Sequence, residues 1–175
     1  GLGDVYKRQD LQKSLESITM ALNSEDSETS HYAASVLCDE LNKFRSQVQK
    51  MYTGMQQEGE EETDYEKMML DYMNRVLSQK VFTTLEQTKY VKMLEEATES
   101  LYRKNRERIF VKQYEGLCLR LLELKKFPET EKWCRRLVQQ HGNTLEAYTC
   151  QLKLYFTMGE REKFFQVMQL SLIHI

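Results

Sequence analysis

The residues that could do chemistry on their own are four cysteines and three histidines. No two cysteines have a CxxC or CxxxC spacing, and the histidines lie far from them in the sequence, so no zinc or redox motif is present. Three of the cysteines recur at equal intervals, at positions that suit helix packing, and we interpret them as core residues. A thiol switch and a metal site are the alternatives. The residues are Cys38, Cys118, Cys134 and Cys150, with His31, His141 and His174.

Motifs for enzyme catalysis are missing from the chain. It has no GxSxG, no P-loop and no GxGxxG. His31 opens an expected helix and is interpreted as a capping or packing residue, and the basic run at 103–108 as a solvated helix end. The nine methionines are interpreted as core filler, with an adaptable binding groove as the alternative. We therefore expect no catalytic activity, no cofactor and no metal.

The composition indicates an all-helical protein. The chain has 175 residues, of which 41% are hydrophobic and 30% charged, with one Pro and seven Gly. Its net charge of −2 comes from mixed acidic and basic residues, so nucleic acid is a poor candidate partner. No stretch approaches the roughly 18 consecutive apolar residues that a membrane span needs. The lack of paired cysteines favours a reduced, cytoplasmic location.

The two ends of the chain differ from the rest. Residues 1–9 (GLGDVYKRQ) and 170–175 (LSLIHI) are similar to translated sequencing-adapter read-through, so we treat both segments as non-native. We expect the natural segment to cover residues 10–169 and to come from a longer gene.

Two helices are expected in residues 10–55. Leu11, Leu15, Ile18 and Leu22 form one apolar stripe, and a second helix follows from about residue 28 to 55, capped by Asp26 or Ser27. This pair resembles a HEAT-type hairpin, because the second helix opens with an acidic turn followed by an alanine pair. Residues 56–62 (QQEGEEE) are polar and predict an acidic linker or hinge.

Capping boxes predict a further hairpin over residues 63–105. Thr63 with Glu66 forms one box and Thr84 with Gln87 forms the other, each followed by a helical apolar stripe. The two helices would be joined at residues 80–83.

The sequence from Val111 onward repeats itself with a shift of about 34 residues, the length of one tetratricopeptide (TPR) unit. Lys125 stands where a TPR unit favours glycine, and Phe164 where it favours a small residue. Residues 141–144 supply a helix stop and restart. We predict an all-α solenoid of stacked antiparallel hairpins, TPR-like over residues 63–169. The matched pairs are Tyr114 with Tyr148, Cys118 with Leu152, Leu121 with Tyr155, Leu124 with Met158, Trp133 with Val167, and Cys134 with Met168.

The concave wall of a TPR array comes from the first helix of each unit. Leu119, Leu122 and Phe156 are the apolar residues expected there, and the Lys/Asn clamp that grips C-terminal carboxylates is not reproduced. An amphipathic helix of another protein is therefore the expected partner. The predicted groove consists of Lys112, Glu115, Leu119, Leu122, Glu146, Thr149, Lys153 and Phe156.

The order of these pieces, with SHYAASVL in a HEAT-like hairpin followed by a tyrosine-rich helical pair and TPR units, resembles the PelE family of bacterial exopolysaccharide secretion machinery. The resemblance implies a non-catalytic scaffold that holds synthase and transporter subunits together, with a membrane anchor upstream of Asp10. Two alternatives stay open: a TPR-type regulatory domain of a transcription or signalling protein, and a small-ligand or enzyme module.

Overall fold

A computed structural model describes residues 13–174, and over these residues the chain is entirely helical, without a β-strand. The predicted all-α class is thereby confirmed. Residues 1–12, which include Leu11 and the predicted adapter-like segment 1–9, lie outside the described residues. Residues 13–22 are helical, and the later helices are α2 (Ser27–Gln57), α3 (Asp64–Leu77), α4 (Thr84–Asn105), a 3-10 turn η1 (Arg106–Arg108), α5 (Val111–Glu123), α6 (Phe127–His141), α7 (Leu145–Met158) and α8 (Arg161–His174).

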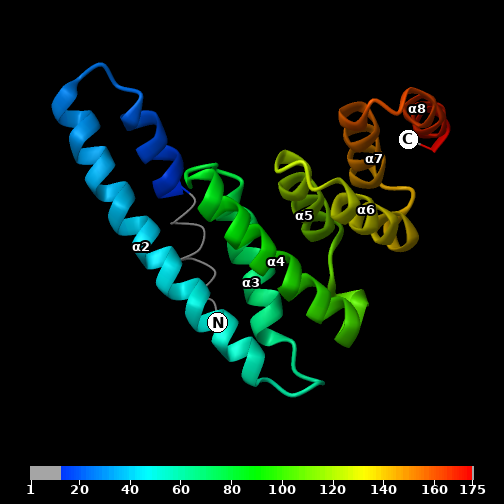
Figure 1. Ribbon diagram of the computed structural model, residues 1–175, viewed down its shortest axis with the longest axis horizontal. Helices are drawn as coiled ribbons and strands as arrows, with labels where there is room; N and C mark the ends of the chain where they lie inside the picture. The colour runs from blue at the N-terminus through cyan, green and yellow to red at the C-terminus, as the bar shows by residue number, and fades with distance from the viewer. Residues whose placement is uncertain (1–12, 175) are drawn as a thin grey trace.

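The helices follow one another across the molecule in chain order (Figure 1). Neighbours in sequence pack against each other as the pairs α3/α4, α5/α6 and α7/α8. The first helices of these pairs also touch, since α5 contacts both α3 and α7. The long helix α2 packs on α3 and α4 at the opposite end from α8.

Several helix starts follow from capping residues, although two capping boxes were predicted wrongly. Asp26 caps α2 by accepting a hydrogen bond from Thr29 N at 3.2 Å. The residue that caps α4 is Thr83, which accepts from Glu86 N at 3.2 Å, so the predicted box at Thr84 is shifted by one position. Thr63 precedes α3 without any side-chain capping bond, because its hydroxyl accepts from Arg108.

The turns inside the three hairpins share one backbone feature. Lys80, Lys125 and Gly159 each follow the first helix of a pair and adopt positive φ values of 55°, 57° and 73°. Such left-handed residues end helices by redirecting the chain. Lys125 and Gly159 are separated by one repeat length, so the position where the repeat pattern favours glycine adopts the same conformation in both hairpins.

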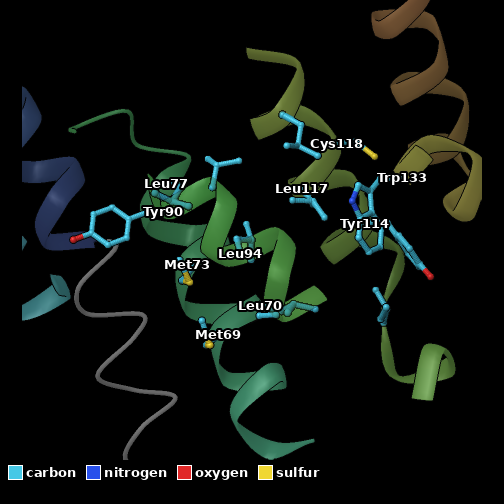
Figure 2. Packing of buried hydrophobic residues seen from close by; sticks show 14 of the residues in the cluster. Met69, Leu70, Met73, Leu77, Tyr90, Leu94, Tyr114, Leu117, Cys118 and Trp133 are labelled. Atoms are coloured by element: carbon cyan, nitrogen blue, oxygen red, sulfur yellow. The ribbon is translucent and has the colours of Figure 1, made fainter. Parts of the chain in front are cut away.

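One hydrophobic core runs from the first helices to α7. Phe44 of α2 is fully buried, and its ring lies 5.4 Å from Tyr72, 5.0 Å from Phe82 and 5.1 Å from Tyr90. Figure 2 follows the core from Met73 and Leu94 to the rings of Tyr114 and Trp133. The boundary predicted at residues 56–62 therefore does not interrupt the core, and α2 extends through Gln57.

The C-terminal part of α8 is helical through His174, so residues 170–174 continue the helix. Leu170, Leu172 and Ile173 are exposed there. Their assignment to adapter-derived sequence stays a prediction. Among the described helices, none combines the length and the apolar composition that a membrane crossing requires.

Candidate functional site

The predicted groove residues lie on two adjacent helices, α5 and α7. Residues 112, 115, 119 and 122 recur at helical spacing on α5, as do 146, 149, 153 and 156 on α7, so each set forms one stripe. Lys112 joins the stripes, because its Nζ lies 3.3 Å from Glu115 Oε1 and 3.2 Å from Glu146 Oε1. The structure thus brings the N-terminal ends of both stripes together.

The apolar members of these stripes differ in exposure. Phe156 is 76% exposed, and its ring centroid lies 6.2 Å from that of Phe164 on α8. Leu119 and Leu122 are both half-buried, and Leu122 packs on the hydrophobic core. Thr149 is half-buried and Lys153 is exposed. The surface of this face is therefore apolar at Phe156 and charged at Lys112 and Glu146.

Electrostatics keep the charged end of this face ionised. Hydrogen bonds to Glu146 and Glu115 raise the pKa of Lys112. A backbone hydrogen bond at Glu146, which lies in the first turn of α7, lowers the pKa of its carboxyl, and Lys112 lowers it further. Both signs of charge are present at neutral pH.

Helix α3 extends the same face beyond α5. Gln113 Nε2 donates to Asp71 Oδ1 at 3.0 Å. A Cβ atom at Gly116 would overlap the Asn74 side chain, so glycine permits the close approach of α5 to α3. The first helices α3, α5 and α7 thus lie side by side, with α5 in the middle.

The second helices of the first two pairs, α4 and α6, are joined by contacts that the sequence patterns did not predict. Arg136 of α6 pairs with Glu99 of α4 through bonds of 2.6 and 3.1 Å. Its guanidinium also lies 3.9 Å from the centroid of Tyr102 and 4.6 Å from that of Trp133. Trp133 Nε1 donates to Glu95 at 3.2 Å. These contacts fasten α6 to α4.

Two equivalent hollows lie between successive hairpins. The first, of about 240 Å³, is lined by α4 and the junction of α5 with α6, including Val91, Leu121 and Glu129. The second, of about 340 Å³, is lined by α6, α7 and α8, including Cys134, Tyr155 and Lys163. Tyr155 and Lys163 follow Leu121 and Glu129 by one repeat length, so the same spacing builds both hollows. None of the predicted groove residues lines either one.

The acidic segment after α2 is held by a buried ionic cluster. Lys104 Nζ lies 2.7 Å from Glu66 Oε1 and 3.6 Å from Glu58 Oε2, and it donates to Glu62 O at 2.8 Å. Ser100 Oγ also donates to Glu66 at 2.7 Å. Glu66 therefore serves as an ion-pair residue and does not complete the predicted capping box, because its side chain turns inward toward α4.

The cysteines predicted to be core residues are buried: Cys118, Cys134 and Cys150 each lie inside the helical packing, while Cys38 is exposed. Within residues 13–174, no group of three histidine, cysteine or acidic side chains is arranged to hold a metal ion. His31 is exposed near the start of α2.

Comparisons of the chain with models of protein families, with curated proteins and with solved structures find no match.

Proposed function

We propose that this chain is a TPR-like helical scaffold, and that the face formed by α3, α5 and α7 binds an amphipathic helix of another protein. The observation that carries the proposal is the exposure of Phe156, 76% of whose surface is accessible near the C-terminal end of α7, on the stripe that begins with the Lys112–Glu146 ion pair. Aromatic residues are enriched at the centres of protein interfaces, so Phe156 suits the centre of a binding surface.

The repeat positions support the TPR-like architecture. Tyr114 and Tyr148 are both buried, as are Trp133 and Val167, and the members of each pair are separated by one repeat length. The left-handed turn residues keep the same spacing. In such stacks each hairpin buries its apolar face only against its neighbours, which leaves the first helices free to form an extended binding wall.

The chemistry of this face fits a partner with one apolar and one charged side. Phe156 offers an apolar contact, and Lys112, Glu146 and Lys153 offer both signs of charge along the same helices. An amphipathic helix presents apolar residues every three or four positions with charges beside them, so it can meet both features at once.

Replacing Phe156 with Asp tests the proposal. We expect the variant to keep its helical circular dichroism, because the side chain is exposed, and to lose partners that immobilised wild-type chain captures from its source cells. Phe165→Asp is the matched control, since Phe165 is a 51% exposed aromatic residue on α8. Identical sets of captured proteins for wild type and Phe156→Asp would refute the groove assignment.

A narrower proposal assigns the scaffold to an exopolysaccharide machine of the Pel type, and it rests on the sequence resemblance alone. Genes for a glycosyltransferase and a multi-span transporter beside this gene would support it, and their absence would refute it. A sensor or DNA-binding domain in the same gene would favour the alternative, a TPR-type regulatory domain.

A further inference from the structure

Three cysteines from three consecutive helices meet in the interior of the C-terminal hairpins. Cys118 lies on α5, Cys134 on α6 and Cys150 on α7, and they are 1%, 4% and 1% exposed. Helices α5, α6 and α7 pack against one another, the thiol of Cys118 interacts with both other thiols, and all three are free. A free cysteine packs as a small apolar residue, and its reactivity is what distinguishes it from other small apolar side chains.

One of the three cysteines borders the second hollow. Cys134 lines this space of about 340 Å³ together with Arg135 and Lys163, whereas Cys118 and Cys150 do not line it. A space of roughly 15 Å³ already admits a water molecule. A hydroperoxide is small enough to enter this space, and Cys134 is the one of the three cysteines that it would meet there.

The surroundings favour ionisation of this same thiol. Hydrogen bonds from Cys118 and then Cys150 lower the pKa of Cys134 and outweigh the opposing effect of burial. The same interaction with Cys134 raises the pKa of Cys118. The thiolate is the nucleophilic form of cysteine, so the direction of this shift favours the same cysteine that lines the hollow.

We propose that Cys118, Cys134 and Cys150 form a peroxide-responsive thiol site, in which Cys134 is oxidised through the hollow and a neighbouring cysteine then forms a disulfide with it.

The chemistry requires only the thiols and one molecule of a hydroperoxide. The Cys134 thiolate attacks one peroxide oxygen, the O–O bond breaks, and the departing oxygen takes a proton and leaves as water or an alcohol. The sulfur of Cys118 or Cys150 then attacks Cys134, the S–O bond breaks, and hydroxide leaves with the thiol proton as water. Two thiols are oxidised to one disulfide, and the peroxide is reduced.

Each disulfide would connect different elements. A Cys134–Cys118 bond joins α6 to α5 within one hairpin, whereas a Cys134–Cys150 bond joins α6 to α7 of the next hairpin. The second bond would fix the two C-terminal hairpins to each other. Oxidation would thereby stiffen the stack without altering the face at Phe156.

Peptide mapping of the folded wild-type chain after treatment with hydrogen peroxide tests the proposal. Free thiols are then blocked with iodoacetamide, and the chain is digested with trypsin. The four cysteines fall in separate tryptic peptides, so every disulfide is identified by the pair of peptides that it joins and by the loss of two hydrogens. These peptides cover residues 14–43, 113–120, 133–135 and 137–153.

We expect the peptide of Cys134 to become linked to that of Cys118 or Cys150. Because Cys134 lines the hollow and its neighbouring thiols favour the thiolate, it should react roughly tenfold faster than Cys38. This preference should vanish in concentrated urea, where the cluster no longer exists. Faster oxidation of Cys38 in the folded chain, or oxidation of Cys134 without a link, would overturn the proposal.

Two variants test whether Cys134 is the cysteine that forms the links. Cys134→Ser should abolish both links, while Cys38→Ser should leave them unchanged. Circular dichroism reports whether Cys134→Ser folds, and the mapping of the wild-type chain decides the question even if that variant does not.

Discussion

At the residue scale, the carboxyls of Glu58 and Glu66 share one buried site with Lys104. The Lys104 and Glu58 side chains are each 5% exposed and that of Glu66 is fully buried. Oε2 of Glu58 and Oε2 of Glu66 have no other hydrogen-bond partner, and the two carboxyls lie within hydrogen-bonding range. A proton on Glu58 that is donated to Glu66 satisfies both oxygens.

This arrangement separates the two pKa values. Burial and then the hydrogen bond with Glu66 raise the pKa of Glu58. Burial alone would raise the pKa of Glu66, but hydrogen bonds from Glu58, Lys104 and Ser100 outweigh it and lower that pKa. The cluster is therefore most stable at pH values between the pKa of Glu66 and the pKa of Glu58, where the two carboxyls share one proton.

Glu58→Gln should lower the dependence of stability on pH. A group whose folded pKa is raised stabilises fully below its unfolded pKa, and the contribution is lost as pH rises through the folded pKa. The amide of glutamine cannot ionise and retains a donor for Glu66. The unfolding free energy of Glu58→Gln relative to wild type should thus increase as the pH rises above about 4, the ordinary glutamate pKa, toward neutral pH, measured by urea denaturation.

The matched control for this experiment is Glu60→Gln. Glu60 belongs to the same acidic segment, and its side chain is 78% exposed and pairs with Arg103. Its free energy difference from wild type should stay constant across the same pH range, and a parallel change in both variants would argue against the shared proton.

Lys125→Gly should stabilise the chain by roughly 0.5–1 kcal/mol, because a residue with a Cβ atom adopts a left-handed conformation at a cost of about 1–2 kcal/mol and glycine loses more chain entropy on folding. Lys125 has φ of 57° and an exposed side chain. Thermal unfolding measures the change. The neighbouring exposed Lys126→Gly should not stabilise, since Lys126 adopts a negative φ of −84°.

At the element scale, the second helices are joined by polar and aromatic contacts over the buried core. Arg136 reaches from α6 to Glu99 on α4 and lies against Tyr102 and Trp133. Its side chain is 20% exposed, so the ion pair is partly shielded from solvent. Shielded, bidentate pairs contribute more than ordinary surface pairs.

Arg136→Ala should lower the unfolding free energy by about 1–2 kcal/mol, because it removes a bidentate pair and cation–π contacts. Arg135→Ala offers a neighbouring control on the exposed side of α6 and should change stability by less than about 0.5 kcal/mol. Urea denaturation of both variants gives the comparison. Equal losses would mean that the α4–α6 contact does not depend on Arg136.

At the scale of the whole molecule, the core passes without interruption from α2 to α7. The acidic segment after α2 is fastened to α4 by Lys104 and Arg103, which leaves α2 in close packing with the helices that follow. A shared core favours unfolding as one unit.

The fluorescence of Trp133 can test whether the chain unfolds as one unit. Trp133 is the single tryptophan and is fully buried between α4, α5 and α6. Its fluorescence and the far-ultraviolet circular dichroism should report the same urea midpoint. Tyr52→Phe, which removes the bond from α2 to Glu96, should shift both signals together. A separate circular dichroism transition that leaves the fluorescence unchanged would indicate that residues 10–55 unfold as an independent domain.

The sequence by itself determined the helical class, most helix limits and the spacing of the last two hairpins. These properties depend on local rules: apolar residues every three or four positions, and caps such as Asp26 and Thr144. It also placed Lys125 and Gly159 at equivalent turns. Only the tertiary structure decided which side chains meet across the packing.

Glu66 illustrates the difference, because its local spacing indicates a capping box while Lys104, far along the chain on α4, draws it into a buried cluster. The gathering of Cys118, Cys134 and Cys150 likewise requires three helices to dock in register. Helix periodicity states which face of a helix is apolar but not which neighbouring face it meets. That choice is made by packing and by the pairing of buried charges, which depend on the whole chain at once.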